Sequence, residues 1–240
     1  MELIKRGTAP GTPSIHQKDI RSHSLTLGDS HALSAWVEGS KCSRNDGLTL
    51  NGAINRGFDT YIDDMNMDDF HRLRLYMGNI DLRHHLLRLY PDVKEACFKA
   101  ECLAREYVHE AIRVKNKYKF NSVEIVELLP VEHEARRLPK TGFYKGQPFW
   151  GSAEDRMIVR NAFNQKVREL QKLYGGFTII EWPSHYQHCT EFSVETNEVS
   201  GVFKDFEGPI VFKPGMLRFD VMEKPHSVHV APSFYLWEIV

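Results

Sequence analysis

Short apolar runs that suit β-strands alternate with longer runs at helical spacing, and this alternation constrains the fold more than any other feature. The strand-like runs, each ending beside a glycine or a proline, are 24–27, 73–77, 122–129 and 177–182. Two amphipathic helices are predicted at 92–117 and 155–173. The alternation predicts an α/β fold of three layers, α/β/α, with a mainly parallel sheet.

The remaining elements are less regular. We expect residues 1–22 to form a leader or strap and residues 23–240 to form a single domain. In the first part of the chain we expect a helix start at 32–37, a polar turn at 40–47, and a helix over 48–62 that is weakened by Gly52 and Gly57. Later we expect an irregular loop at 139–152 and short strands within 199–212 and 216–222.

Composition excludes several classes of protein. The chain has 240 residues, of which 42% are hydrophobic and 26% charged, as in ordinary globular domains. Its net charge of −1 gives no strong signal for nucleic acid. No run approaches the roughly 20 apolar residues of a membrane span, and the N-terminus lacks the apolar core of a signal peptide. With four scattered cysteines, we expect a cytoplasmic protein with reduced thiols and no membrane partner; the oligomeric state stays open.

Three polar segments are candidates for chemistry: Gly28–His31, Gly78–Asp81 and His226–His229. The first two follow predicted strands, and ligands of parallel sheets bind beyond the carboxyl ends of the strands. A serine, amide donors in turns and a late histidine are the components of nucleophilic acyl transfer. We therefore expect these segments to share one crevice.

The ordered segments resemble the SGNH (GDSL-like) hydrolase family. LTLGDSHALSAW resembles its first block, MGNIDLR its third, and KPHSVHVAP its last. The resemblance implies an SGNH or flavodoxin-like fold, no cofactor, and cleavage of an acyl or acetyl ester of a sugar or other small metabolite. It also implies that Ser30 is the nucleophile and His229 the base, with Asp29 and Asp81 in the catalytic set.

The sequence departs from the family pattern at three places. Ile80 stands where the family has its oxyanion-hole asparagine, and His226 stands where it has the aspartate that orients the base. The glycine of the second block is either Gly52 or Gly57. Because a missing oxyanion donor costs about 2.7–4 kcal/mol of transition-state stabilisation, other groups must replace it. The candidate oxyanion or substrate-binding residues are Gly28, His31, Gly78, Asn79, Arg83, His84 and His226.

Two other functions remain open. Asp29-Ser30-His31 and Gly78-Asn79-Ile80-Asp81 also resemble parts of calcineurin-like metallophosphoesterases, which implies a metal-dependent phosphoester hydrolase acting on a nucleotide. The departures at Ile80 and His226 are equally compatible with a binding module that has kept the crevice without the chemistry.

Structural roles compete with each functional one. Ser30 can cap the following helix, and Asp81 can form an ion pair with Arg83. The basic and aromatic stretch 136–150 is favoured as a loop packed on the body over a phosphate- or base-binding lid. His185 and His188 have the spacing of a metal pair, but no third ligand is marked, so no metal is predicted.

Overall fold

A six-stranded sheet forms the centre of the computed structural model, which describes residues 13–16, 23–37, 40–62, 65–133, 144–194, 210–221 and 229–236. The strands are β1 (Pro13–His16), β2 (Ser24–Gly28), β3 (Lys41–Asn45), β4 (Arg72–Tyr76), β5 (Ser122–Val126) and β6 (Thr178–Ile180). Their order is β1-β3-β2-β4-β5-β6, and all pairs except β1–β3 are parallel. The five parallel strands thus follow the flavodoxin-like order 2-1-3-4-5.

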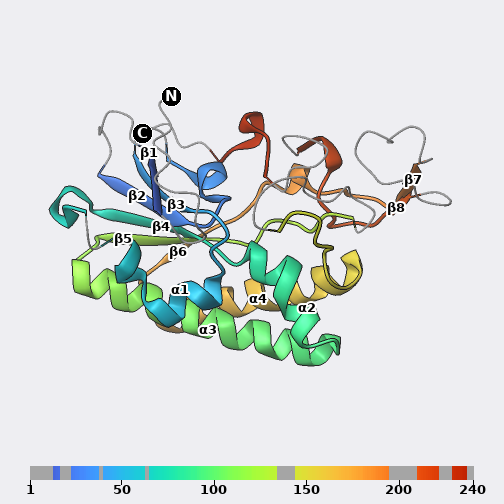
Figure 1. Ribbon diagram of the computed structural model, residues 1–240, viewed down its shortest axis with the longest axis horizontal. Coiled ribbons are helices and arrows are strands. Elements are labelled where there is room, and N and C mark those ends of the chain that lie inside the picture. Colours follow the sequence, from blue (N-terminus) through green and yellow to red (C-terminus); the bar gives the residue numbers. More distant parts are fainter. Residues whose placement is uncertain are drawn as a thin grey trace.

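One face of the sheet is covered by the α-helices (Figure 1). They are α1 (Leu50–Arg56), α2 (Leu86–Leu89), α3 (Val93–Tyr118) and α4 (Ala153–Tyr174). The two long helices begin where the sequence supplies caps, because the side chain of Asp92 accepts from the amide of Glu95 and Ser152 forms a capping box with Asp155. Their apolar faces, which on α3 are rich in alanine, pack with the sheet into the main core.

The opposite face is covered by short 3-10 helices. They are η1 (Ala32–Ala35), η7 (Phe219–Val221) and η8 (Pro232–Phe234). Side chains alternate across the strands, so Leu75 and Ile125 point into the main core while Tyr76 and Val126 join a second core with Trp182. The fold is therefore the expected three-layer α/β/α arrangement with a mainly parallel sheet, and its thinner layer consists of single 3-10 turns.

The structure corrects several expected elements. Residues 40–47 contain β3 where a polar turn was expected, because Cys42, Ser43 and Asn45 are buried between two neighbouring strands. The expected helix over 48–62 divides into α1 and η2 (Phe58–Tyr61), because Gly57 with φ of +79° ends α1. The helix expected from 32 is only η1.

The remaining segments are short. β7 (Phe192–Val194) pairs with β8 (Ile210–Phe212), which lies within one range where a strand was expected. The range 216–222 holds η7 and one bridge at Leu217 in place of the expected strand. The other short helices are η3 (Met67–Asp69), the π-helix η4 (Asp81–His85) and η5 (Ser184–Tyr186). None of the described helices is both long and apolar enough to cross a membrane.

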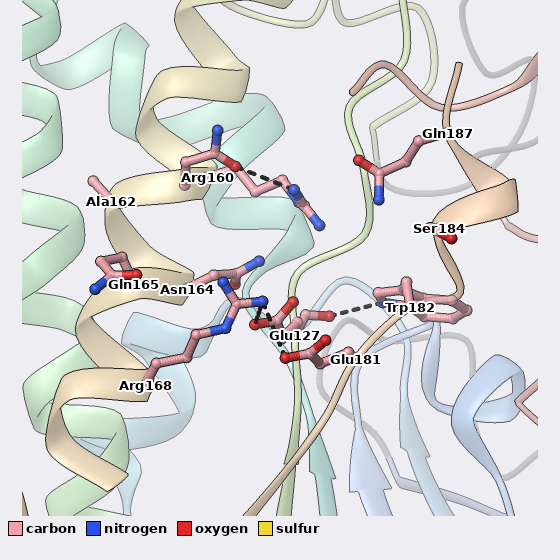
Figure 2. A pocket seen from close by; sticks show the side chains of 11 residues that line it. Glu127, Arg160, Ala162, Asn164, Gln165, Arg168, Glu181, Trp182, Ser184 and Gln187 are labelled. Atoms are coloured by element: carbon pink, nitrogen blue, oxygen red, sulfur yellow. Dashed lines mark hydrogen bonds and ion pairs between the residues drawn. The ribbon is translucent and has the colours of Figure 1, made fainter. Parts of the chain in front are cut away.

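The carboxyl ends of β2, β4, β5 and β6 meet at one edge of the sheet. The chain runs from β2 to β3 on one side and then to β4 on the other, which makes the β2–β4 junction the topological switch point. Farther along the same edge, Glu127 and Glu181 follow β5 and β6 and face α4 across a polar cavity (Figure 2).

Candidate active site

Ser30 lies at the carboxyl end of β2, at the switch point. β2 and β4 approach so closely there that a Cβ on Gly28 would overlap the carbonyl oxygen of Tyr76, which only glycine avoids. The next residue, Asp29, donates its amide to the same oxygen at 3.3 Å. Ser30 is half-buried and does not cap η1, whose N-cap is His31 without a side-chain bond.

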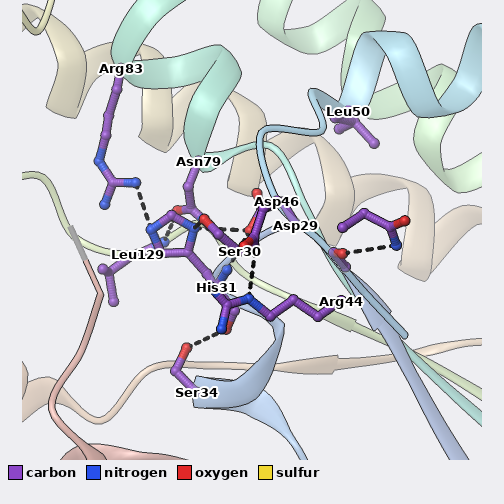
Figure 3. A network of polar contacts seen from close by, with 12 residues as sticks. Asp29, Ser30, His31, Ser34, Arg44, Asp46, Leu50, Asn79, Arg83 and Leu129 are labelled. Atoms are coloured by element: carbon purple, nitrogen blue, oxygen red, sulfur yellow. Dashed lines mark hydrogen bonds and ion pairs between the residues drawn. The ribbon is translucent and has the colours of Figure 1, made fainter. Parts of the chain in front are cut away.

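A buried chain of polar contacts lies beneath Ser30 (Figure 3). One oxygen of Asp29 accepts from the amide of His31 at 2.8 Å and contacts the His31 Nδ1 at 2.9 Å. The Nη1 of Arg83 donates to the His31 Nε2 at 2.9 Å. Because a guanidinium only donates, Nε2 is the acceptor and Nδ1 carries the proton. His31 is therefore a neutral imidazole held between an anion and a cation.

Arg83 is anchored by Glu132. Its Nη2 and Nε donate to the two oxygens of Glu132 at 2.6 and 3.2 Å, and both side chains are 4% exposed. Burial alone would lower the pKa of Arg83, but the charge and hydrogen bonds of Glu132 raise it above the ordinary value. The possible ion pair between Asp81 and Arg83 is not formed, because the guanidinium of Arg83 pairs with Glu132.

His229 lies beside His31. Its ring lies edge-on to that of His31, with centroids 5.0 Å apart. His31 itself is poorly suited as a base: its Nδ1 is 3.5 Å from the Ser30 Oγ, and its proton already goes to Asp29. The structure thus places Asp29, Ser30 and His229 around His31. His226 lies outside the described residues.

Asn79 is the side-chain donor nearest in the chain to the place of the missing asparagine. It is 1% exposed, and its Oδ1 accepts from the amide of Leu129 at 2.9 Å, which fixes the direction of the Nδ2. That Nδ2 makes no well-formed hydrogen bond among the described residues, although Asn79 is near enough to Tyr76 to lower its pKa slightly against the larger effect of burial. Gly78, with φ of +110°, turns the chain between β4 and Asn79.

Asp81 has a different role from the expected catalytic one. Its two oxygens accept from the amides of Leu50 and Asn51, at 2.6 and 3.3 Å, and so cap α1 from another element. Burial raises the pKa of Asp81 to about 7, against the effect of these hydrogen bonds. Asp81 also lines a separate cavity of about 550 Å³ with His85 and Lys99.

His84 packs beneath the segment that follows the undescribed residues 134–143. Its ring stacks on Tyr144 at 4.2 Å and contacts Phe149 edge-on, while the amide of Trp150 donates to the carbonyl of Arg83. Burial and the charge of Arg83 lower the pKa of His84 to about 4. Tyr144 and Phe149 of the basic and aromatic stretch therefore pack against His84, whereas Trp150 is exposed.

The other histidine pair is also packed among aromatic rings. His188 contacts the stacked rings of Phe192 and Phe212, and His185 contacts Tyr186. Within the described ranges, no three His, Cys, Asp or Glu side chains are grouped closely enough to hold a metal ion.

Sequence reasoning missed Glu132 and Tyr76. Glu132 lies 49 positions from Arg83 in the chain, so no local pattern joins them. A weak signal exists, because Glu132 closely follows a strand that ends at the same edge of the sheet as β2. Tyr76 was hidden inside an apolar run, although it is the last residue of β4 and is buried beside the site.

Comparisons with known proteins add little to this geometry. No protein family matches the chain, and no curated protein does so either. Among solved structures, the chain is similar to a Streptococcus pneumonia protein provisionally named a platelet activating factor, with a TM-score of 0.42 and 17% identity. The match covers 66% of this chain and 65% of that one, so just under two thirds of that protein's length is spanned.

Proposed function

We propose that this chain is a serine hydrolase that cleaves an ester of a small molecule. The observation that supports the proposal is the position of Ser30, which is half-buried at the switch point and next to His31. The ring of His229 contacts that of His31, and the amide of Asn79, which follows the neighbouring strand β4, is oriented by Leu129. These are a nucleophile, a base and an oxyanion donor, the three groups that acyl transfer needs.

In the proposed reaction, the Ser30 Oγ attacks the ester carbon and His229 takes its proton. The negative charge that develops on the carbonyl oxygen is stabilised by the Nδ2 of Asn79 and by backbone amides near Ser30 and Gly78. His229 then gives the proton to the leaving alcohol, and water releases the acyl group from Ser30 by the same steps in reverse. Asp29, His31 and Arg83 form the rigid floor that positions Ser30.

The resemblance to SGNH hydrolases supports the same assignment. The departure at Ile80 then has a physical explanation, since the neighbouring Asn79 can supply the missing donor. The substrate that the resemblance implies is an acyl or acetyl ester of a sugar or another small metabolite.

The metal-dependent alternative fits these residues less well. It needs His31 as a ligand through a ring nitrogen. Both ring nitrogens are engaged, Nδ1 with Asp29 and Nε2 with the guanidinium of Arg83, and a cation there opposes a metal ion. Activity on a phosphoester that disappears with a chelator and survives Ser30→Ala would favour the alternative over the proposal.

The test is labelling of the folded protein with a fluorophosphonate probe and mapping of the adduct by mass spectrometry. We expect a stable adduct on Ser30, none on the Ser30→Ala protein, and much slower labelling of His229→Gln. Ser34→Ala is the matched control, because Ser34 is buried and donates to the carbonyl of His31. Absence of an adduct on folded wild-type protein would overturn the proposal and leave the binding-module function.

A further inference from the structure

A polar cavity of about 620 Å³ lies between α4 and the segments that follow β5 and β6 (Figure 2). Its lining residues do not include Ser30, His31 or His229. The volume is within the usual range of small-molecule sites, roughly 300–1,000 Å³. The cavity is therefore a second candidate site, distinct from the one that holds Ser30.

The acidic residues of this cavity are already paired. The Nη2 of Arg168 contacts a carboxylate oxygen of Glu127 at 2.7 Å and one of Glu181 at 3.3 Å. One guanidinium thus contacts both carboxylates.

Arg160, in contrast, has no carboxylate among its hydrogen-bond partners in the described part of the chain. It is 7% exposed, and its guanidinium points into the cavity in Figure 2. Its Nε donates to the carbonyl of Leu128 at 2.8 Å and its Nη1 to the amide oxygen of Asn161 at 3.2 Å, both of which are neutral partners. Burial lowers the pKa of Arg160 in spite of the nearby charge of Glu127. A buried cation without a carboxylate in contact favours an anion from outside.

We propose that this cavity binds a small organic monocarboxylate that carries hydroxyl groups, with the carboxylate on Arg160. The planar guanidinium matches a carboxylate in shape. Glu127 and Glu181 lie in the same cavity and oppose a doubly charged ligand such as a phosphate dianion. Gln187 points into the cavity from the wall opposite Arg160, and Ser184 lies beside it, so both can bind hydroxyl groups.

This inference goes beyond the proposed hydrolase function and does not depend on it, because it concerns binding and not turnover. Calorimetric titration of the wild-type protein at pH 7.5 tests it with three probes: gluconate, glucose and inorganic phosphate. We expect gluconate to bind with a dissociation constant below about 10 mM and the other two to bind more weakly.

Gln187→Glu is the informative variant, since it adds a negative charge across the cavity and leaves the bonds of Arg160 to Leu128 and Asn161 intact. We expect it to weaken gluconate binding about tenfold, because like charges then face one another. Gln165→Glu is the matched control: Gln165 is exposed at the far end and bonded to Glu169, so binding should be unchanged. No heat with gluconate, equal binding of glucose, tighter binding of phosphate, or equal effects of the two variants would each overturn the proposal.

Discussion

Arg83 connects the candidate active site to the body of the protein, because it donates to His31 on one side and to Glu132 on the other. Removing one partner of a buried ion pair usually costs about 3–5 kcal/mol, since the other charge stays buried. We expect Glu132→Gln to lower the free energy of unfolding by about 3 kcal/mol in urea denaturation, and to slow fluorophosphonate labelling of Ser30 as His31 loses its fixed position.

The control at this scale is Glu181→Gln. Glu181 contacts Arg168 at 3.3 Å, but its side chain is 65% exposed, so its ion pair is screened by solvent. We expect the free energy of unfolding of the Glu181→Gln protein to differ from that of the wild type by less than about 1 kcal/mol. If both variants lost the same stability, the pair with Arg83 would have no special structural role.

At the scale of elements, the junction between η4 and α1 depends on one carboxyl group. Asp81 caps α1, and burial raises its pKa to about 7, above the value of about 4 in an unfolded chain. Between these pH values the folded protein holds the proton that the unfolded chain has released. The contribution of Asp81 to stability is therefore largest below about pH 4 and is lost as the pH rises towards 7.

The prediction compares the stability of the wild-type protein with that of the Asp81→Asn variant. Asp81→Asn keeps one oxygen for capping α1 but cannot ionise. We expect the stability of the wild type relative to Asp81→Asn to fall as urea denaturation is repeated at increasing pH from 4 to 7.5. A difference that stays constant over this range would show that Asp81 does not titrate with a raised pKa.

The elements that the sequence predicted share a local signal. α3 and α4 have apolar residues at helical spacing, and β2, β4, β5 and β6 are apolar runs ended by glycine or proline. β3 has no such signal, because its polar residues are buried only through pairing with β1 and β2. In the candidate site, short motifs singled out Ser30 and His229, and both lie beside His31 in the structure. The partners of Arg83 and Asp81 were not singled out, since they are 49 and 31 positions away and depend on the tertiary structure.

At the scale of the whole molecule, the chain after β5 links the cavity to the candidate active site. Leu128 is held from the α4 side, where its amide donates to Asn164 and its carbonyl accepts from Arg160. The amide of the next residue, Leu129, donates to Asn79, which follows β4. A change on α4 can therefore alter the direction of the proposed oxyanion donor.

We accordingly expect Asn164→Leu to slow labelling of Ser30 about tenfold, a fraction of the 2.7–4 kcal/mol that complete loss of an oxyanion donor costs. Gln165→Leu, the neighbouring change on the same helix, should label at the wild-type rate, because Gln165 is exposed and its side chain bonds to Glu169 of the same helix. Circular dichroism would establish that both variants are folded. Equal labelling rates would mean that Asn79 is oriented without help from the backbone of Leu128 and Leu129, and that the two sites work independently.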